Sequence, residues 1–310
     1  MEAIIITISI ILCSSLLFFT RNYFLKRNIV DKINIRSSHT EIATRSGGIA
    51  IYFTLLLISI YYYFIGIDIF DYSLLVPLTL LLMIGLYDDV YNIDFKLKFI
   101  FQIVAAKILI DNGYIIENFH GILGLNELNR VFAQVFSMFI IVATINSINF
   151  IDGIDGLAAS VISIFIILFE FFSINNTPYY IPSIIVLISF IPFLYFNVIS
   201  KNKVFLGDSG SLFLGGLVSV YVLHILSSEY LIQKEFDINK VIFVVSILSY
   251  PIIDIIRVFF IRVYNGKSPF EADKNHIHHI ILNKFKSHIK TTLFIILLML
   301  SFSGLIHLII

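Results

Sequence analysis

Long apolar stretches follow one another along almost the whole chain, and short polar segments separate them. Each stretch covers about 18–20 residues, the length that a helix needs to cross the hydrocarbon core of a membrane. Helices are expected because lipid offers no partners to backbone N–H and C=O groups, and because the weaker alternating pattern of a membrane β-barrel is absent. The pattern predicts an all-α, polytopic transmembrane helical bundle forming a single domain, residues 1–310. About ten spans are expected, at 3–20, 47–65, 73–87, 97–111, 130–148, 156–173, 180–198, 210–227, 240–261 and 292–310.

The distribution of basic residues predicts the orientation of these spans. The first span begins at Glu2 and is followed by Arg21, Lys26 and Arg27, which is typical of a retained anchor whose N-terminus lies outside. Loops after odd-numbered spans then face the cytoplasm. That side carries seventeen Lys and Arg residues and the other side carries four, a bias that marks the cytoplasmic side of a membrane. We therefore expect a multi-pass protein of the bacterial inner membrane.

Composition excludes an ordinary soluble protein. Hydrophobic residues make up 58% of the chain and charged residues only 14%, whereas a soluble domain carries about a quarter charged residues. Nucleic acid is not among the expected partners. Cys13 is the only cysteine, which excludes an intramolecular disulfide and a cysteine-rich metal site.

Four polar clusters interrupt the apolar pattern. The order of the spans places all four in loops on the basic side of the membrane, although the orientation itself rests only on apolar length and on Lys and Arg. Such convergence predicts a functional site on that face. The clusters are Asp88-Asp89 with Asp94, Lys96 and Lys98; Asn146-x-x-Asn149-x-x-Asp152-Gly-x-Asp155-Gly156; Gly207-Asp208-Ser209-Gly210-Ser211; and His276-x-His278-His279.

The pair Asp88-Asp89 follows an apolar run that reaches into the bilayer. Carboxylates there are costly and usually functional, and two adjacent ones repel each other unless a cation or a proton relieves them. Mg²⁺ suits these hard oxygen ligands, and it typically takes one or two carboxylates together with water and substrate phosphates. On the pair alone, an ordinary polar helix end stays open as the alternative.

The second cluster is more specific. Asn146, Asn149 and Asp152 recur every three residues, so they share one face if the helix continues. The glycines after Asp152 and Asp155 permit a turn and a close approach of the backbone to a ligand. Helix capping explains Asp155 before the next apolar stretch, but it does not explain the two asparagines and the second aspartate. A ligand-binding turn is the favoured interpretation.

The other two clusters are weaker signals when taken alone. Asp208 or Ser209 is expected to cap a helix whose free N–H groups attract phosphate oxygens. Three interpretations of His276, His278 and His279 are a zinc site, a pH-sensitive loop and contacts to a diphosphate. Basic residues in the same loop favour the diphosphate.

Two charged residues lie inside the ninth predicted span. Asp254 and Arg257 are three positions apart, and an i,i+3 ion pair that neutralises both buried charges is the expected arrangement. No functional role is assigned to them.

The order of the motifs resembles the polyprenyl-phosphate N-acetylhexosamine-1-phosphate transferases, glycosyltransferase family 4. The similarity runs from about Arg36 to Leu282 and indicates the amino-sugar branch, which starts O-antigen, teichoic acid, capsule and related surface polymers. Many members of that branch carry another span after the tenth, whereas this sequence stops at Ile310, so the contacts of a homodimer are left open. The motifs are Arg36-Ser-Ser-His39-Thr40 with Thr44-Arg45-x-Gly47-Gly48, Asp88-Asp89, Asn149-Phe-Ile-Asp152-Gly-Ile-Asp155-Gly-Leu, Phe205-Leu-Gly-Asp208-Ser-Gly-Ser, and Ser268-Pro-Phe270 leading to His276-Ile-His278-His279.

The resemblance implies a reaction and a role for each matching residue. N-acetylhexosamine 1-phosphate, by default GlcNAc-1-phosphate, is expected to pass from a UDP-N-acetylhexosamine to undecaprenyl phosphate at the cytoplasmic face, releasing UMP. The implied cofactor is Mg²⁺, with Mn²⁺ as a substitute, and membrane lipid is a further partner. The resemblance assigns metal binding to Asp208, Asp89 and Asp88, catalysis to Asp88, Asp89, Asp152 and Asp155, and substrate contacts to Asn146, Asn149, Lys98, His276, His278 and His279.

The rival class is an ion-coupled secondary transporter with acidic residues inside the membrane. It predicts charged groups near the midplane, broken helices and two repeated halves. Most acidic residues of this chain fall at one end of the spans, and no inverted repeat is visible. The transferase is therefore the favoured function.

Overall fold

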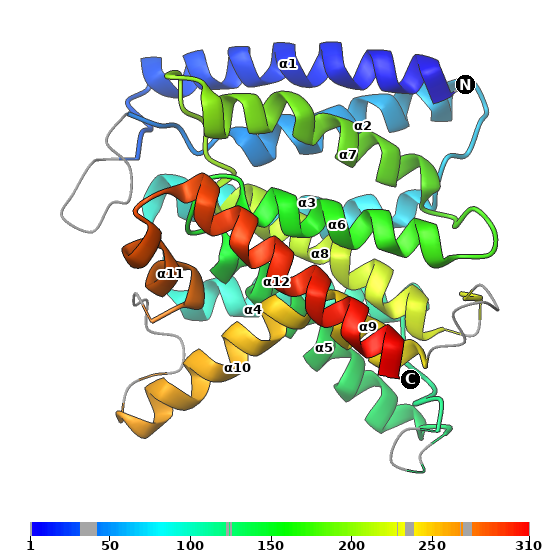
Figure 1. Cartoon of the computed structure of the whole chain (residues 1–310). Helices are drawn as coiled ribbons and strands as arrows, with labels where there is room; N and C mark the ends of the chain where they lie inside the picture. The colour runs from blue at the N-terminus through cyan, green and yellow to red at the C-terminus, as the bar shows by residue number, and fades with distance from the viewer. Residues whose placement is uncertain are drawn as a thin grey trace. The chain divides into compact units, whose positions relative to one another are not determined.

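The computed structural model describes residues 2–31, 42–121, 124, 126–227, 229–232, 239–266, 268 and 275–309. Arg36, His39, Thr40, Pro269 and Phe270 of the motifs lie outside these residues. Within them the chain is helical, and the extended pairings are isolated bridges only. Figure 1 shows the helices: α1 Glu2–Lys26, α2 Gly47–Phe64, η1 Tyr72–Leu74, α3 Leu75–Tyr91, α4 Phe95–Asp111, α5 Arg130–Ile151, α6 Leu157–Phe172, α7 Tyr180–Leu194, η3 Tyr195–Ile199, α8 Gly207–Leu226, α9 Lys240–Ile247, α10 Ser249–Tyr264, α11 Ile277–Phe285 and α12 His288–Ile309.

The helices form two compact units, and each unit is built from two separate segments of the chain. The first unit comprises Met1–Ile108 and Asn176–Leu217, and the second comprises Leu109–Asn175 and Val218–Ile310. The division falls within α4 and within α8. The single domain over residues 1–310 stays a prediction.

In the first unit, α1, α2 and α7 pack side by side, and α2 also packs on α3. The N-terminal half of α8 approaches α2 closely, because a Cβ atom on Gly48 would lie only 2.0 Å from Cα of Gly210. The segment before α8 also accepts the first N–H groups of α2, from Gly47 to Phe205 O and from Gly48 to Leu206 O, both at 2.9 Å. These bonds satisfy donors that a helix start leaves without partners, and they fix where α8 begins.

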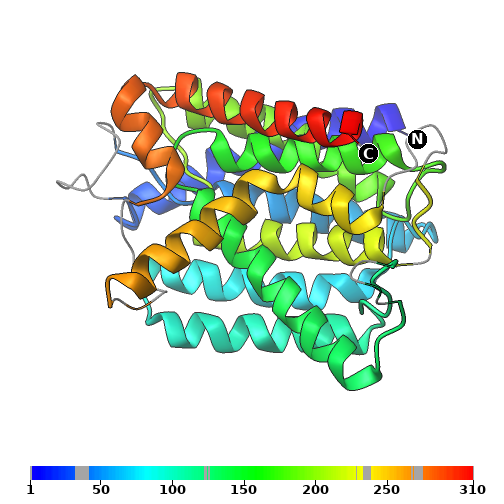
Figure 2. The same cartoon turned by 60° about the horizontal axis from the view of Figure 1, so that its bottom comes forward.

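In the second unit, aromatic side chains form much of the core. The rings of Phe169 and Tyr221 stack with centroids 4.7 Å apart, and Tyr230 stacks on the same Phe169 at 5.4 Å. The buried Tyr230 hydroxyl donates a 2.7 Å hydrogen bond to the Phe169 carbonyl. Such ring pairs contribute about 0.5–1.5 kcal/mol each beyond their burial. Figure 2 shows α10 beside α5, on which it packs.

The structure confirms a polytopic helical bundle but supports fewer full-length spans than the ten predicted. All ten predicted stretches contain helix, yet seven helices among the described residues are long and apolar enough to cross a membrane, or eight if a bent pair counts as one span. α4 and α6, with 17 and 16 residues, are shorter than the 18 residues that such a span needs.

The ninth predicted span is not one continuous helix, which corrects the sequence prediction. α9 ends at Ile247, and α10 starts at Ser249 after a bend of 76°. Pro251 has no N–H to donate to the Ile247 carbonyl, and its ring crowds that carbonyl. The helix therefore stops one turn before the proline and restarts in a new direction.

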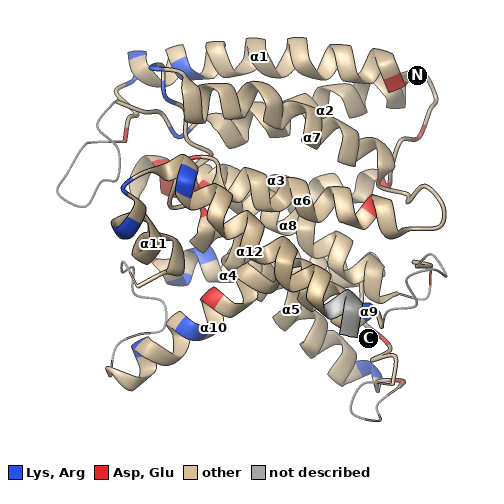
Figure 3. Ribbon diagram, viewed as in Figure 1, with Lys and Arg blue, Asp and Glu red and all other residues tan. Residues whose placement is uncertain are grey.

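The outward faces of several helices are apolar, as expected for lipid contact. Phe18 and Phe19 of α1 are 64% and 68% exposed, and Phe139 of α5 is 64% exposed. Large apolar patches are rare on soluble proteins and mark contact surfaces. Figure 3 shows that Lys and Arg of α1 lie at its C-terminal end, opposite Glu2 at its start.

Candidate active site

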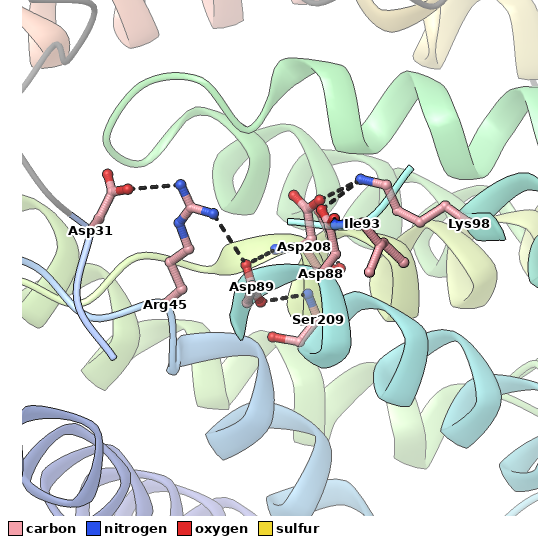
Figure 4. A network of polar contacts seen from close by, with 9 residues as sticks. Asp31, Arg45, Asp88, Asp89, Ile93, Lys98, Asp208 and Ser209 are labelled. Atoms are coloured by element: carbon pink, nitrogen blue, oxygen red, sulfur yellow. Dashed lines mark hydrogen bonds and ion pairs between the residues drawn. The ribbon is translucent and has the colours of Figure 1, made fainter. Parts of the chain in front are cut away.

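Three aspartates of the first unit meet where α3 ends and α8 begins (Figure 4). Asp88 and Asp89 occupy the last turn of α3, and Asp208 lies in the first turn of α8. α3 ends at Tyr91, and the next residue, Asn92, adopts a left-handed conformation with φ of 51°. The Asp88 carboxylate then accepts a 2.8 Å hydrogen bond from the Ile93 N–H. The end of α3 is thereby held in place by one of the predicted site residues.

Lys98 of α4 connects two of these carboxylates. Its Nζ atom lies 2.8 Å from Oδ2 of Asp88 and 2.6 Å from Oδ2 of Asp208. Two carboxylates that face a common point repel each other unless a cation lies between them. The side chains of Asp88 and Asp208 are 12% and 27% exposed. The first unit therefore holds two solvent-reachable carboxylates around one positive charge.

Asp89 has a different environment, because neighbouring residues on a helix point about 100° apart. Its Oδ1 accepts a hydrogen bond from the Asp208 N–H and its Oδ2 accepts one from the Ser209 N–H, both at 2.9 Å. The Asp89 side chain is fully buried. This carboxylate satisfies donors at the N-terminus of α8 and lies at the positive end of the helix dipole.

Arg45 balances the charge of this cluster. Its Nη1 lies 3.8 Å from Oδ1 of Asp89, and its Nη2 donates a 2.7 Å bond to Asp31. Burial lowers the pKa of Arg45, but the carboxylates of Asp31, Asp89 and Asp208 outweigh that effect and raise it. The sequence motif contains Arg45, yet its spacing gave no sign of an ion pair with a residue 44 positions further along.

Two glycines let these elements come together. Gly207, with φ of 77°, takes a backbone conformation that other residues rarely adopt, and a Cβ there would lie 2.7 Å from Oδ2 of Asp89. A Cβ on Gly85 would lie 2.3 Å from the Asp208 carbonyl oxygen. The glycines therefore set the distance between α3 and the first turn of α8.

In the second unit, the predicted asparagine and aspartate cluster lies at the C-terminal end of α5. Asn146 is buried, and its amide donates a 2.8 Å bond to the Val142 carbonyl. Asn149 lies on the last turn, and Asp152 is the residue at which the helix ends. The segment then turns through Gly153 toward α6. Asn146 and Asn149 thus lie on one helix at the predicted spacing, whereas Asp152 lies just beyond its end.

Asp155 is held by α12 rather than by its own helix. The Asp155 N–H donates a 3.1 Å bond to Nδ1 of His288, and the Asp155 carbonyl accepts a 3.1 Å bond from Thr292. Helix capping was the alternative interpretation of Asp155, but the residue directly before α6 is Gly156. His288 lies 133 positions beyond Asp155 and outside the histidine motif, so motif spacing gave no reason to pair the two residues.

The predicted histidines lie against this turn. His278 is completely buried, and a Cβ atom on Gly153 would lie 2.4 Å from its Nε2. The Tyr250 hydroxyl lies 3.1 Å from its Nδ1. Burial, together with the neighbouring His279 and His276, lowers the pKa of His278 to about 2. His278 is therefore neutral at physiological pH.

The expected ion pair between Asp254 and Arg257 is wrong. Asp254 instead accepts hydrogen bonds from the loop that carries the histidines, at 2.7 Å from Nδ1 of His276 and 2.8 Å from the Ile277 N–H. Arg257 donates a 2.6 Å bond to the Asn275 carbonyl. The i,i+3 spacing allowed a local pair, but both side chains find partners about twenty residues further along.

The chain is similar in sequence to a known family of membrane enzymes. Its sequence matches glycosyl transferase family 4 over residues 72–226, which is half of the chain. The chain belongs to this family. A Haemophilus influenzae relative, an undecaprenyl-phosphate alpha-N-acetylglucosaminyl 1-phosphate transferase, is 32% identical over 82% of this chain and 72% of its own length. A relative of the same name from Escherichia coli (strain K12) is 29% identical over 89% of this chain and 75% of its own length.

The acidic cluster of this family 4 protein fits an incomplete cation site. Among the described residues, no group of three or more His, Cys, Asp or Glu side chains is arranged to hold a metal ion. Both oxygens of Asp89 accept hydrogen bonds from the start of α8, and its cationic neighbour is Arg45 at 3.8 Å. Asp88 and Asp208 are therefore the two carboxylates that share one cationic group, Lys98. Two carboxylates, completed by water and substrate phosphates, are what Mg²⁺ typically takes.

The predicted site residues of the family 4 chain therefore form two clusters, one in each unit. The first unit brings together Asp88, Asp89, Lys98 and Asp208. The second unit brings the turn after α5 against His278. The union of both clusters in one pocket stays a prediction.

Proposed function

We propose that this chain transfers an N-acetylhexosamine 1-phosphate from a UDP-sugar to undecaprenyl phosphate and releases UMP. GlcNAc-1-phosphate is the default, since the similar Haemophilus influenzae and Escherichia coli proteins carry N-acetylglucosaminyl 1-phosphate in their names. The observation that carries the proposal is the pair of carboxylates around Lys98 in a chain of this family. Such a pair suits a metal-bound pyrophosphate. The pathway served would be the first membrane step of a surface polysaccharide.

In the proposed reaction, an oxygen of the lipid phosphate attacks the β-phosphorus of the UDP-sugar. The bond from that phosphorus to the oxygen bridging the two phosphates breaks, and UMP leaves with the electron pair. A phosphate monoester has a second pKa of about 6. The phosphate of the lipid is therefore largely dianionic at neutral pH and needs little help from a base. Asp88 is the candidate base. Catalysis then consists mainly of positioning and charge stabilisation.

The cofactor assigned to this reaction is Mg²⁺, with Mn²⁺ as a substitute, and Asp88 and Asp208 would hold it. When bound, the ion would neutralise charge on the phosphates and on the leaving UMP. Lys98 supplies an ammonium at the same place, and it would contact a phosphate oxygen if Asp88 and Asp208 held the ion. Asp89 keeps the first turn of α8 in position.

The second cluster is assigned to the nucleotide and sugar. Asn146, Asn149, Asp152 and Asp155 would line the nucleotide and diphosphate region, and His276, His278 and His279 would contact the sugar phosphate. The turn between Asp152 and Asp155 lies against His278, which supports a common role for these segments. The site is proposed to face the cytoplasm at the inner membrane, where a UDP-sugar is available.

The test is an assay of the purified protein with undecaprenyl phosphate and a panel of UDP-amino sugars, read out as UMP release. EDTA should abolish the release and added Mg²⁺ should restore it, while Zn²⁺ should not. Asp208→Asn should lower the rate by at least about a hundredfold, since a lost charge-stabilising group typically costs that much. Asp94→Asn is the matched control, because Asp94 is an exposed aspartate directly before α4, the helix that carries Lys98. No UMP release with any sugar of the panel would refute the proposal.

A further inference from the structure

One face of α10 is buried although it carries ionisable side chains. Tyr250, Asp254, Val258 and Arg262 follow each other at four-residue spacing, and they are 6%, 0%, 1% and 2% exposed. Residues four apart lie on one face of a helix. Buried charges are costly unless they are paired and hydrogen-bonded. The partners of these side chains therefore indicate what the face is for.

The partners are the histidines of the loop before α11. The Tyr250 hydroxyl contacts His278 at 3.1 Å, Asp254 contacts His276 at 2.7 Å, and Arg262 Nη2 lies 3.3 Å from Nε2 of His276. Arg262 also lies over the ring of Phe150, with Cζ 5.8 Å from its centroid. The buried face of α10 thus binds two of the three predicted substrate-contacting histidines.

The contacts of His276 specify one tautomer. An ionised Asp254 can only accept a hydrogen bond, so Nδ1 of His276 must carry a hydrogen. The guanidinium of Arg262 can only donate, so Nε2 of His276 must present its lone pair. Both contacts agree on a neutral ring protonated at Nδ1. The imidazole therefore links a buried carboxylate to a buried guanidinium.

Asp254 also holds the backbone directly after His276. Its second oxygen accepts a 2.8 Å bond from the Ile277 N–H, the first residue of α11. The His276 side chain makes no capping bond at that helix start, so Asp254 supplies the cap from another helix. Arg257 holds the preceding residue through the Asn275 carbonyl at 2.6 Å. Among the described residues, Arg257 thus hydrogen-bonds to backbone only, whereas Asp254 contacts both backbone and ring.

We propose that Asp254 is a positioning residue that sets the tautomer and the ring orientation of His276 for the transfer reaction. The proposal rests on the proposed function for its consequence in catalysis. A hydrogen-bond partner of this kind fixes which nitrogen is protonated and how the imidazole plane is oriented. Its loss typically lowers activity by about 10–100-fold. Arg262 donates to the other ring nitrogen, Nε2, which can accept this hydrogen bond only in the same tautomer.

The first test reads the tautomer without any substrate. In protein labelled with ¹⁵N-histidine, the signals that disappear in His276→Gln belong to His276. Wild type should show His276 protonated on Nδ1 and not on Nε2 at about pH 7.5, and Asp254→Asn should lose that preference because its amide no longer offers only acceptors. A wild-type ring that is protonated on Nε2, or on both nitrogens, would overturn the proposal, even if the variant does not fold.

The second test is a double-mutant cycle on UMP release. Asp254→Asn should lower kcat/KM by about 10–100-fold, and it should cause less than about a twofold further loss in the His276→Gln background, since it acts through that ring. Arg257→Gln, which loosens the same loop, should leave the tautomer unchanged and cost much less than Asp254→Asn. Full additivity in the cycle, or an equal loss from Arg257→Gln, would overturn the proposal. A wild type without UMP release would instead refute the proposed function, and the tautomer would still decide this inference.

Discussion

At the scale of the residue, Lys98 takes the place for which a divalent cation would compete. Its ammonium lies within 2.8 Å of a carboxylate oxygen of Asp88 and of Asp208. A metal must displace this charge before it can bind both oxygens. We therefore expect Lys98→Met to tighten Mn²⁺ binding by about tenfold, or about 1.4 kcal/mol, while UMP release falls. Mn²⁺ titration followed by electron paramagnetic resonance measures this.

Lys96→Met is the matched control for this prediction. Lys96 lies on the same helix as Lys98 but is exposed, so its loss changes the local charge equally without opening the carboxylate pair. We expect its Mn²⁺ affinity to stay within about twofold of wild type, because exposed charges are largely screened. Weaker Mn²⁺ binding in Lys98→Met would show that the lysine supports the metal rather than competing with it.

A second residue, His278, predicts how stability responds to acid. Burial, then His279 and His276, lower its pKa to about 2, whereas a histidine in an unfolded chain titrates near about 6.5. Between these values the unfolded chain binds a proton that the folded chain does not, so the free energy of unfolding decreases as pH falls below about 6.5. The limiting slope for one group is about 1.4 kcal/mol per pH unit.

Melting temperatures measured from about pH 7.5 down to pH 5 test this prediction. Wild type should lose stability steadily below about pH 6.5. His278→Asn should be less stable at neutral pH, yet its melting temperature should depend less on pH, because the group that takes up the proton on unfolding is gone. An equal slope in both proteins would contradict the assignment.

The residues of the site show what spacing in a sequence can and cannot predict. Asp88 and Asp89 look equivalent in the sequence, but their helix directs one toward Lys98 and the other toward the start of α8. Sequence spacing suggested a pair between Asp254 and Arg257, whereas the structure gives each a partner near His276. Motifs predicted which polar residues to consider, but only the packing of helices distinguishes a residue that faces a cation from one that caps a helix.

At the scale of the element, the length of the apolar stretches predicted where helices occur. Neither lipid nor a buried core offers partners to backbone N–H and C=O groups, so the backbone must bond to itself. It did not predict the break between α9 and α10, since both halves are apolar and Pro251 was treated as part of one span. Nor did it predict how closely α2 and α8 approach, which depends on which glycines face each other. Periodicity identifies elements, whereas contacts between elements need the fold.

This close approach predicts that α2 tolerates no side chain at Gly48. A methyl group there would lie 2.0 Å from Cα and 2.2 Å from N of Gly210, and the backbone of α8 cannot move aside without breaking its contact with Asp89. We expect Gly48→Ala to destabilise the protein by at least about 1–3 kcal/mol, the usual cost of overpacking. Thermal unfolding in detergent measures this.

Gly304 of α12 provides the control for Gly48, because it is also helical and nothing lies within 4 Å of its Cβ position. Gly304→Ala should be neutral or should stabilise by up to about 1 kcal/mol, since alanine has the higher helix propensity. Equal melting temperatures for the two variants would show that α2 and α8 are further apart than the contact between Gly48 and Gly210 requires.

At the scale of the whole molecule, the predicted orientation requires the clusters of both units to face the cytoplasm. Each unit carries its own reference points. In the first unit, α2 separates the loop around Lys201 from the loop around Asp68. In the second unit, the length of α5, roughly 30 Å, separates Glu127 from the turn at Asp152. The orientation of each unit can therefore be tested without assuming how the units are arranged.

Cysteine labelling makes this test, because Cys13 is buried and is the only cysteine to remove, as Cys13→Ala. In that background, Lys201→Cys and Lys284→Cys report the predicted cytoplasmic ends, and Asp68→Cys and Glu127→Cys report the opposite ends. All four positions are exposed. We expect a membrane-impermeant maleimide to label the second pair in intact cells and the first pair only after permeabilisation, because the basic ends of membrane proteins stay inside. If one unit follows this pattern and the other reverses it, the two clusters open on opposite sides of the membrane, and a single active site formed by both is excluded.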